Sequence, residues 1–146
     1  HSTTFNNFLD CHATLTESHG EIKSYGFPQG YYHNMDCTWL IQRSHGEVIE
    51  IRFTSFDVES VYVNLHVDAS KDNHRKNFGA LHNFNVQSYF SYDSLTIYDG
   101  GSTSSDLVGI FCGNSLPPSH ISSSHEVLIH FQTNSVGSYD GFQIEY

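Results

Sequence analysis

The sequence predicts an all-β fold, an antiparallel β-sandwich, on three observations. Apolar and polar residues alternate with period two in short segments, as in strands that have one face in a core and one in water. Glycine-rich and serine-rich turns separate these segments. No window of about 12 residues shows a helical period with caps. Many short strands without helix signals are typical of a sandwich or a barrel.

The expected strands are spread over most of the chain. The first, at 20–24, is weak and precedes a turn-rich stretch at 26–30. The remaining expected strands cover 37–41, 48–53, 94–98, 107–112, 126–131 and 142–146. A chain of 146 residues is long enough for one hydrophobic core and too short for two. We therefore expect a single domain over 11–146.

Two segments do not share this pattern. Residues 1–10 are polar and unpatterned, which predicts a flexible lead-in. Residues 60–89 begin with alternation but continue into a polar stretch at 68–77, so we expect a long inserted loop there. A long loop inside a compact domain is usually either functional or disordered, and the sequence does not separate these two possibilities.

The charge of the chain limits its partners. The formal net charge is −10, from 6 Lys+Arg and 16 Asp+Glu. This balance disfavours nucleic acid and anionic membranes, and it favours cationic partners or a divalent metal. No apolar run approaches the roughly 18 residues that span a bilayer, and there is no signal-peptide core. We expect a processed extracellular segment that does not itself insert into a membrane.

Familiar catalytic and zinc-binding motifs are absent from the sequence. It contains no Gly-x-Ser-x-Gly elbow, no Cys-x-x-Cys and no phosphate-binding loop, so we expect no enzymatic activity and assign no catalytic residue. The eleven histidines form no zinc motif and are interpreted as surface side chains, with a pH-dependent binding surface as the alternative. The three cysteines leave one thiol outside any intramolecular disulfide, and their number alone does not show which two pair.

Several short motifs in the sequence resemble those of the CUB domain, an extracellular β-sandwich used for protein recognition. They are YDSLTIYDGG, GIFCG and GSYDGFQIEY in this order, preceded by GFPQGYYHNMDCTWLI and GEVIEIRFTSFDVE. The resemblance extends from Cys11 to Tyr146 and implies a CUB-like jelly roll, secreted or in the ectodomain of a membrane protein. It implies a core that contains Trp39, Ile41, Ile49, Ile51, Phe53, Leu95, Ile97, Val127, Ile129, Phe131, Phe142 and Ile144.

The resemblance also assigns the cysteines. It implies a disulfide between Cys11 and Cys37. The family's usual partner of Cys112 is replaced here by Phe90, so we expect the second disulfide to be lost and Cys112 to keep its thiol. Two interpretations of that thiol stand: a buried, inert small hydrophobe, or an exposed group that forms an intermolecular disulfide.

A calcium-binding subset of CUB domains holds Ca²⁺ at one end of the sandwich. Carried over by position, its ligands correspond to Glu59, Asp93, Asn134 and the backbone carbonyl of Ser135, with Tyr31 as the orienting residue. Ca²⁺ takes six to eight oxygen ligands, and an amide at the third acidic position removes one negative charge. We therefore expect weak Ca²⁺ binding, with a metal-free polar clasp as the alternative.

The predicted function is recognition of an extracellular protein. The resemblance implies that Tyr31, Glu59 and Asp93 form an acidic loop surface that binds a basic residue of the partner. One alternative is assembly through Cys112. Another is glycan binding by exposed tyrosines, for which the candidates are Tyr32, Tyr62, Tyr89 and Tyr139. The sequence leaves the partner and the oligomeric state open.

Overall fold

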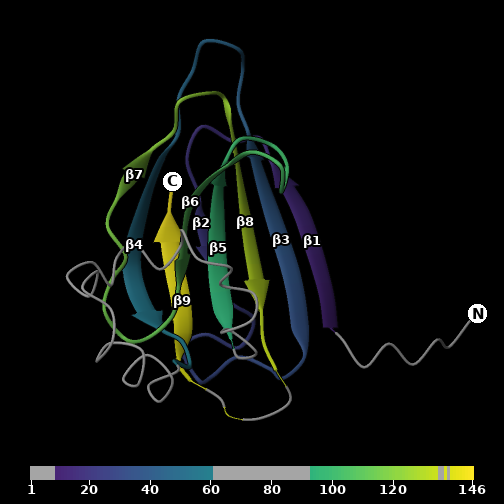
Figure 1. Cartoon of the computed structure of the whole chain (residues 1–146), viewed down its shortest axis with the longest axis vertical. Helices are drawn as coiled ribbons and strands as arrows, with labels where there is room; N and C mark the ends of the chain where they lie inside the picture. Colours follow the sequence, from purple (N-terminus) through teal and green to yellow (C-terminus); the bar gives the residue numbers. More distant parts are fainter. Residues whose placement is uncertain (1–8, 61–92, 135–136, 138) are drawn as a thin grey trace, which may run out of the picture.

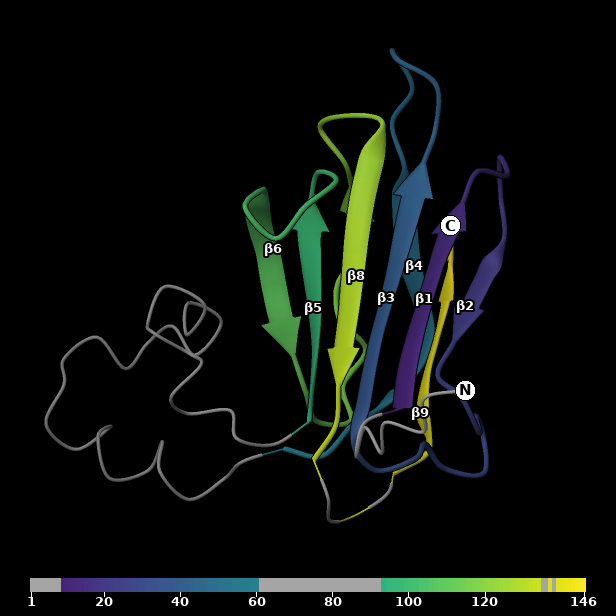
Figure 2. The same cartoon turned by 90° about the vertical axis from the view of Figure 1, so that its right-hand side faces the viewer.

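The structure, a computed structural model, consists of two β-sheets packed face to face (Figures 1 and 2). It describes residues 9–60, 93–134, 137 and 139–146. One sheet has the order β1-β3-β8-β5-β6 and the other the order β2-β9-β4-β7. The all-β sandwich predicted from the sequence is thereby confirmed. Among the described residues, no helix is long and apolar enough to cross a membrane.

The strands of the five-stranded sheet are β1 (Leu9–Leu15), β3 (Met35–Gln42), β8 (Glu126–Gln132), β5 (Ser94–Asp99) and β6 (Asp106–Phe111). The four-stranded sheet contains β2 (Glu21–Lys23), β9 (Gly141–Glu145), β4 (Glu50–Asp57) and β7 (His120–Ile121). Every pairing between these strands is antiparallel except that of β1 with β3, which is parallel.

Two of these strands were not expected from the sequence. β1 begins at Leu9, inside the stretch that was interpreted as a lead-in, while residues 1–8 lie outside the described residues. β7 has two residues, too few to show any alternation. The inserted loop expected at 60–89 also lies almost entirely outside the described residues, as does Phe90.

A disulfide joins β1 to β3. Cys11 and Cys37 are directly opposite in the parallel register and are bonded to each other, as the family resemblance implied. The chain has three cysteines, and Cys11 and Cys37 are bonded to each other, so no intramolecular disulfide can include Cys112. Cys112 follows β6, is partly buried and packs against the core.

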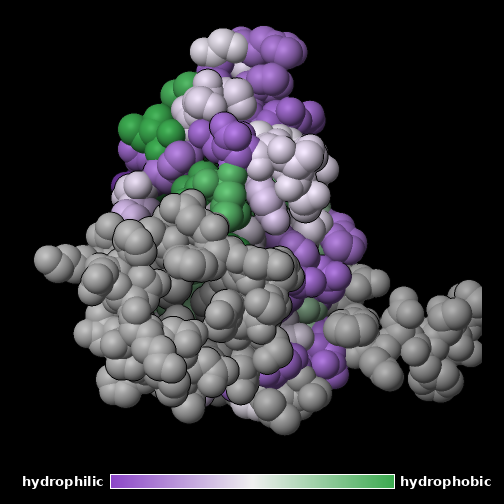
Figure 3. All heavy atoms as spheres, viewed as in Figure 1, coloured by the Kyte–Doolittle hydropathy of each residue, from purple (hydrophilic) through white to green (hydrophobic). Residues whose placement is uncertain are grey.

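The core lies between the inner faces of the two sheets. Phe142 of β9 lies at its centre, with ring centroids 4.9 Å from Phe131 and 5.7 Å from Trp39, both in edge-to-face geometry. The residues that were expected in the core are buried, except that Trp39 is only partly buried. On the described part of the face in Figure 3, hydrophobic residues form small groups among hydrophilic ones.

Candidate functional site

Four of the predicted site residues meet at one end of the sandwich. β4 and β8 run toward this end and β3 and β5 start from it (Figure 1). Glu59 follows β4, Asn134 follows β8, Asp93 directly precedes β5, and Tyr31 lies ahead of β3. The antiparallel order of the strands therefore collects residues that are distant in the sequence. Ser135, the predicted carbonyl ligand, lies outside the described residues.

The four residues are joined by a closed ring of hydrogen bonds, which we call the clasp. The Tyr31 hydroxyl donates to a carboxylate oxygen of Asp93 and accepts a hydrogen bond from the Glu59 backbone N–H at 3.1 Å. The Asn134 backbone N–H donates to Asp93 Oδ1 at 2.7 Å, and Asn134 Nδ2 donates to Glu59 Oε2 at 2.9 Å. The clasp thus links the ends of three strands to the segment before β3.

Burial determines the electrostatics of the clasp. Asp93 is 0% exposed and Tyr31 is 2% exposed. Burial, followed by the hydrogen bond to Asp93, raises the pKa of Tyr31 far above its usual value, so its hydroxyl stays protonated and donates. Burial raises the pKa of Asp93 as well, against the lowering effects of the Tyr31 and Asn134 hydrogen bonds and the nearby His33. Asp93 is therefore a buried acid whose ionised form is stabilised by hydrogen bonds from Tyr31 and Asn134.

The burial changes the role expected for Asp93 and Tyr31. Both were expected to contact a partner, but neither is accessible in the structure. Glu59 is partly exposed, so it is the carboxylate of the clasp that a partner can reach. Asp93 and Tyr31 orient it: Tyr31 holds the Glu59 backbone and Asp93 holds Asn134, which in turn bonds the Glu59 carboxylate.

The fit of the clasp to Ca²⁺ is incomplete. It supplies two carboxylates and one amide, whereas Ca²⁺ takes six to eight oxygen ligands. The nitrogen of the Asn134 amide faces Glu59, and both Asp93 oxygens already accept hydrogen bonds. Among the described residues, no group of three or more His, Cys, Asp or Glu side chains is placed to hold a metal ion. As arranged, both Asp93 oxygens and Glu59 Oε2 are already engaged as hydrogen-bond acceptors.

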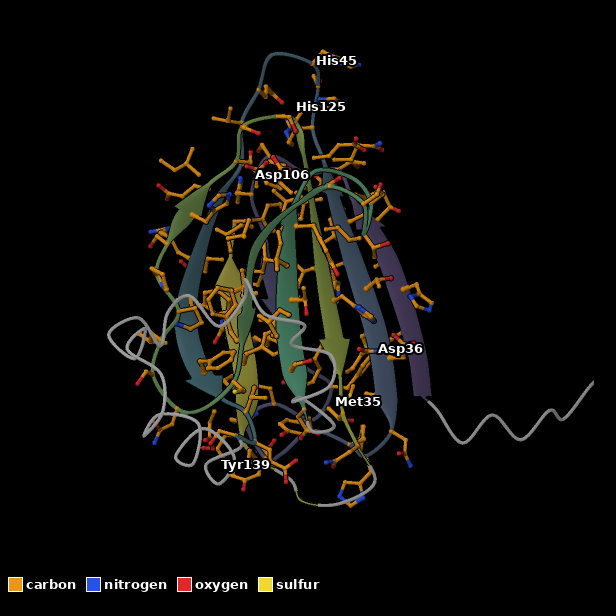
Figure 4. All side chains as sticks on the ribbon, viewed as in Figure 1. Met35, Asp36, His45, Asp106, His125 and Tyr139 are labelled. Atoms are coloured by element: carbon orange, nitrogen blue, oxygen red, sulfur yellow. A yellow bond between two sulfur atoms is a disulfide. The ribbon has the colours of Figure 1, made fainter. Side chains whose placement is uncertain are left out.

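Further acidic and aromatic residues surround the clasp. Asp57 lies at the end of β4 and accepts a hydrogen bond from the Asp140 backbone N–H at 3.2 Å. Tyr32 is 56% exposed and Tyr139 is 39% exposed. Tyr139 lies at this end in Figure 4, and its backbone carbonyl accepts a hydrogen bond from the Tyr31 N–H at 3.1 Å. Tyr62 and Tyr89 are outside the described residues.

Gly137 contributes to the site in a way that the sequence analysis did not anticipate. Its φ is +77°, and a Cβ there would lie 3.1 Å from Glu59 Oε1 and 3.6 Å from Tyr139 Cε2. A glycine at this position allows the backbone to approach the carboxylate and the aromatic ring closely. Gly137 is the first residue of the GSYDG motif, and this glycine was the sequence signal from which a close backbone approach could have been predicted.

We call this end of the sandwich, with Asp57, Glu59, Asp93 and Asp140, the acidic end. The three lysine and arginine side chains in the described part of the chain are paired with glutamates elsewhere. Lys23 pairs with Glu21, Arg43 with Glu47, and Arg52 with Glu50 and Glu145. None of these described cations neutralises the acidic end.

Comparison with known proteins identifies the class of this molecule. The family model of the CUB domain matches residues 11–82 and 77–146, which together cover nearly the whole chain. The chain belongs to the CUB domain family. This family membership gives the chain a general role as an extracellular protein-binding module.

Curated relatives and solved structures agree with this assignment. The chain is 33% identical to human cubilin over 138 residues, and 30% identical to rat neuropilin-2 over 137 residues, 94% of the chain in each case. It spans only 3% of cubilin and 13% of neuropilin-2. A crystal structure of the MASP-1 CUB2 domain bound to Ca²⁺ matches with a TM-score of 0.64 and 21% identity, over 91% of this chain and 95% of that one. At this identity the structural match shows the fold alone.

Proposed function

We propose that the acidic end binds a lysine or arginine side chain of an extracellular protein, with Glu59 making the direct contact. The observation that carries the proposal is the clasp, which holds a partly exposed carboxylate in a fixed position near the exposed Tyr139. A fixed carboxylate gives a charge-assisted hydrogen bond its geometry, and aromatic faces attract cations. In this proposal the chain performs no catalysis and serves as one module of a larger secreted or membrane-anchored protein.

Glu59→Gln tests the proposal with little disturbance of the clasp, because the glutamine oxygen can still accept the Asn134 hydrogen bond. We expect Glu59→Gln to weaken binding to an extracellular partner by at least about tenfold, since a charged pair is lost. The measurement compares capture of secreted proteins by the wild-type chain, by the variant and by Glu21→Gln, an exposed acid on β2 that pairs with Lys23. Equal capture by all three chains would refute the assignment of Glu59.

Calcium is a second component of the proposal. If Ca²⁺ binds, Glu59, Asp93, the Asn134 side-chain oxygen and the Ser135 carbonyl would hold it, and the ion would fix the same loop ends that the clasp now joins. With only two carboxylates, we expect affinity weaker than the roughly 0.1–1 mM of extracellular calcium modules. The clasp then keeps the acidic end formed when calcium is removed.

Asn134→Asp tests this account of calcium. The change restores a third carboxylate and removes the amide donor to Glu59. In about 10 mM Ca²⁺ relative to chelator, we expect the variant to gain roughly 2–3 kcal/mol of unfolding free energy, as for a site with a dissociation constant near 0.1 mM. The wild type should gain less than half of that. Thermal unfolding of both proteins measures the difference, and an unresponsive variant would remove calcium from the proposal.

Glycan binding is the second candidate function, and the exposure of Tyr32 and Tyr139 favours it. Aromatic rings at a surface provide flat apolar faces on which sugars stack. A glycan array separates the two functions. Glycan binding that survives Glu59→Gln and is lost in Tyr32→Ala or Tyr139→Ala supports the second, whereas a partner that requires its own lysine or arginine supports the first.

A further inference from the structure

A pair of histidines lies at the end of the sandwich opposite to the acidic end. His45 is in the loop between β3 and β4, and His125 directly precedes β8. Their ring centroids are 4.1 Å apart, with 44° between the ring planes. Figure 4 shows both side chains at the tip of the molecule, far from Tyr139. The two imidazoles come from loops that are distant in the sequence.

Backbone hydrogen bonds hold these two loops together on both sides of His45. The Arg43 N–H donates to the His125 carbonyl at 2.8 Å. Beyond His45, the Ser122 N–H donates to the Ile49 carbonyl at 2.8 Å, and the Ile49 N–H donates to Ser122 Oγ at 2.7 Å. The positions from which the two imidazoles extend are therefore fixed by the fold.

The charges around the pair favour a cation. A carboxylate oxygen of Glu126 lies 3.9 Å from His125 Nε2, and the other oxygen accepts a hydrogen bond from Gln42 Nε2 at 2.8 Å. Arg43, two residues before His45, is engaged with the Thr16 carbonyl and with Glu47. The tip of the molecule is predominantly hydrophilic in Figure 3.

We propose that His45 and His125 together bind a late first-row divalent ion, such as Zn²⁺, Ni²⁺ or Cu²⁺. Neutral imidazole is a preferred ligand of these ions. The pair supplies two ligands and water supplies the others, since no group of three or more ligand side chains is placed for a metal in the described part of the chain. Glu126 lies where an outer carboxylate can hydrogen-bond a ligand imidazole and orient it.

Binding needs a rotation of the rings, because one nitrogen of each imidazole must point at the ion. His45 is exposed and has room to turn about its side-chain bonds. Other described histidines contact different groups: His12 contacts Thr38, His130 contacts Asp36, and His120 lies near Asp99. The pair is therefore set apart from these histidines by a direct contact between two imidazoles.

Zn²⁺ titration of the intact chain tests the proposal. At pH 7.5, we expect Zn²⁺ to shift the imidazole NMR signals of His45 and His125 together, with one saturating curve. His45→Ala and His125→Ala should each weaken that site by more than the roughly 10- to 100-fold that loss of an outer-shell partner costs. His12→Ala, an exposed histidine on β1, is the matched control and should leave the titration unchanged.

Following the signals of these two rings separates this site from any other among the eleven histidines. Two outcomes would overturn the proposal. One is that Zn²⁺ leaves the His45 and His125 signals in place while shifting those of other histidines. The other is that either alanine variant keeps the wild-type titration curve at the remaining ring.

Discussion

Replacing Cys11 and Cys37 together by serine is expected to lower the free energy of unfolding by roughly 3–4 kcal/mol, from the loop-closure entropy of a crosslink over 26 positions. The effect falls on β1, an edge strand whose described strand partner is β3. Cys37 is fully buried, so the serine hydroxyl adds a cost there. β1 should exchange its amide hydrogens faster than β8 in the variant.

Urea unfolding measures this loss, and Cys112→Ala is the control. Cys112 packs partly buried against the core and takes no part in the disulfide, so its truncation should cost less than half as much. A double serine variant within about 1 kcal/mol of the wild type would show that the crosslink does not constrain the chain as proposed.

Asp93→Ala is expected to lower the free energy of unfolding by about 2–6 kcal/mol. The change removes the Asp93 acceptor from the buried Tyr31 hydroxyl and from the partly buried Asn134 N–H, at about 1–3 kcal/mol for each. Asp93→Asn should cost much less, because its oxygen still accepts from Asn134. The full burial of Asp93 is the reason for the size of this expected effect.

The pH dependence of Asp93 follows from the direction of its pKa shift. Its pKa in the folded state is raised, so the folded protein favours the protonated acid. The contribution of Asp93 is therefore most favourable below its unfolded pKa and is lost as pH rises through the folded value. Relative to Asp93→Asn, the wild type should gain stability as pH falls from 7 toward 4. A stability difference between the two that is constant over this range would contradict the raised pKa.

Much of the fold could be predicted from the sequence because the strands that form its centre alternate clearly. β5, β8 and β9 have apolar residues at every second position, and Leu95, Ile129 and Ile144 are buried accordingly. β1 was missed although Leu9, Cys11, Ala13 and Leu15 alternate with polar residues, because it begins inside the mostly polar stretch at 1–10. β7 is too short for a period to appear.

The candidate site was predictable only in part. The family resemblance selected Tyr31, Glu59, Asp93 and Asn134, and the structure brings all four together. The direction of the Asn134 amide and the burial of Asp93 depend on side-chain packing, which no sequence pattern expresses. The contact of His45 with His125 depends on the register between β3 and β8. In that register Gln42 is opposite Glu126, which brings the loop after β3 close to the residue before β8.

The most direct test of the recognition site uses a small basic probe, N-acetyl-lysine methylamide, followed by NMR on the wild-type chain and on Glu59→Gln. The account predicts saturable, salt-sensitive shifts in the amide signals of Glu59, Asn134 and Gly137, which are much weaker in the variant. Shifts spread evenly over the acidic surface and equal in both proteins would contradict it, as would the absence of any shift at the acidic end.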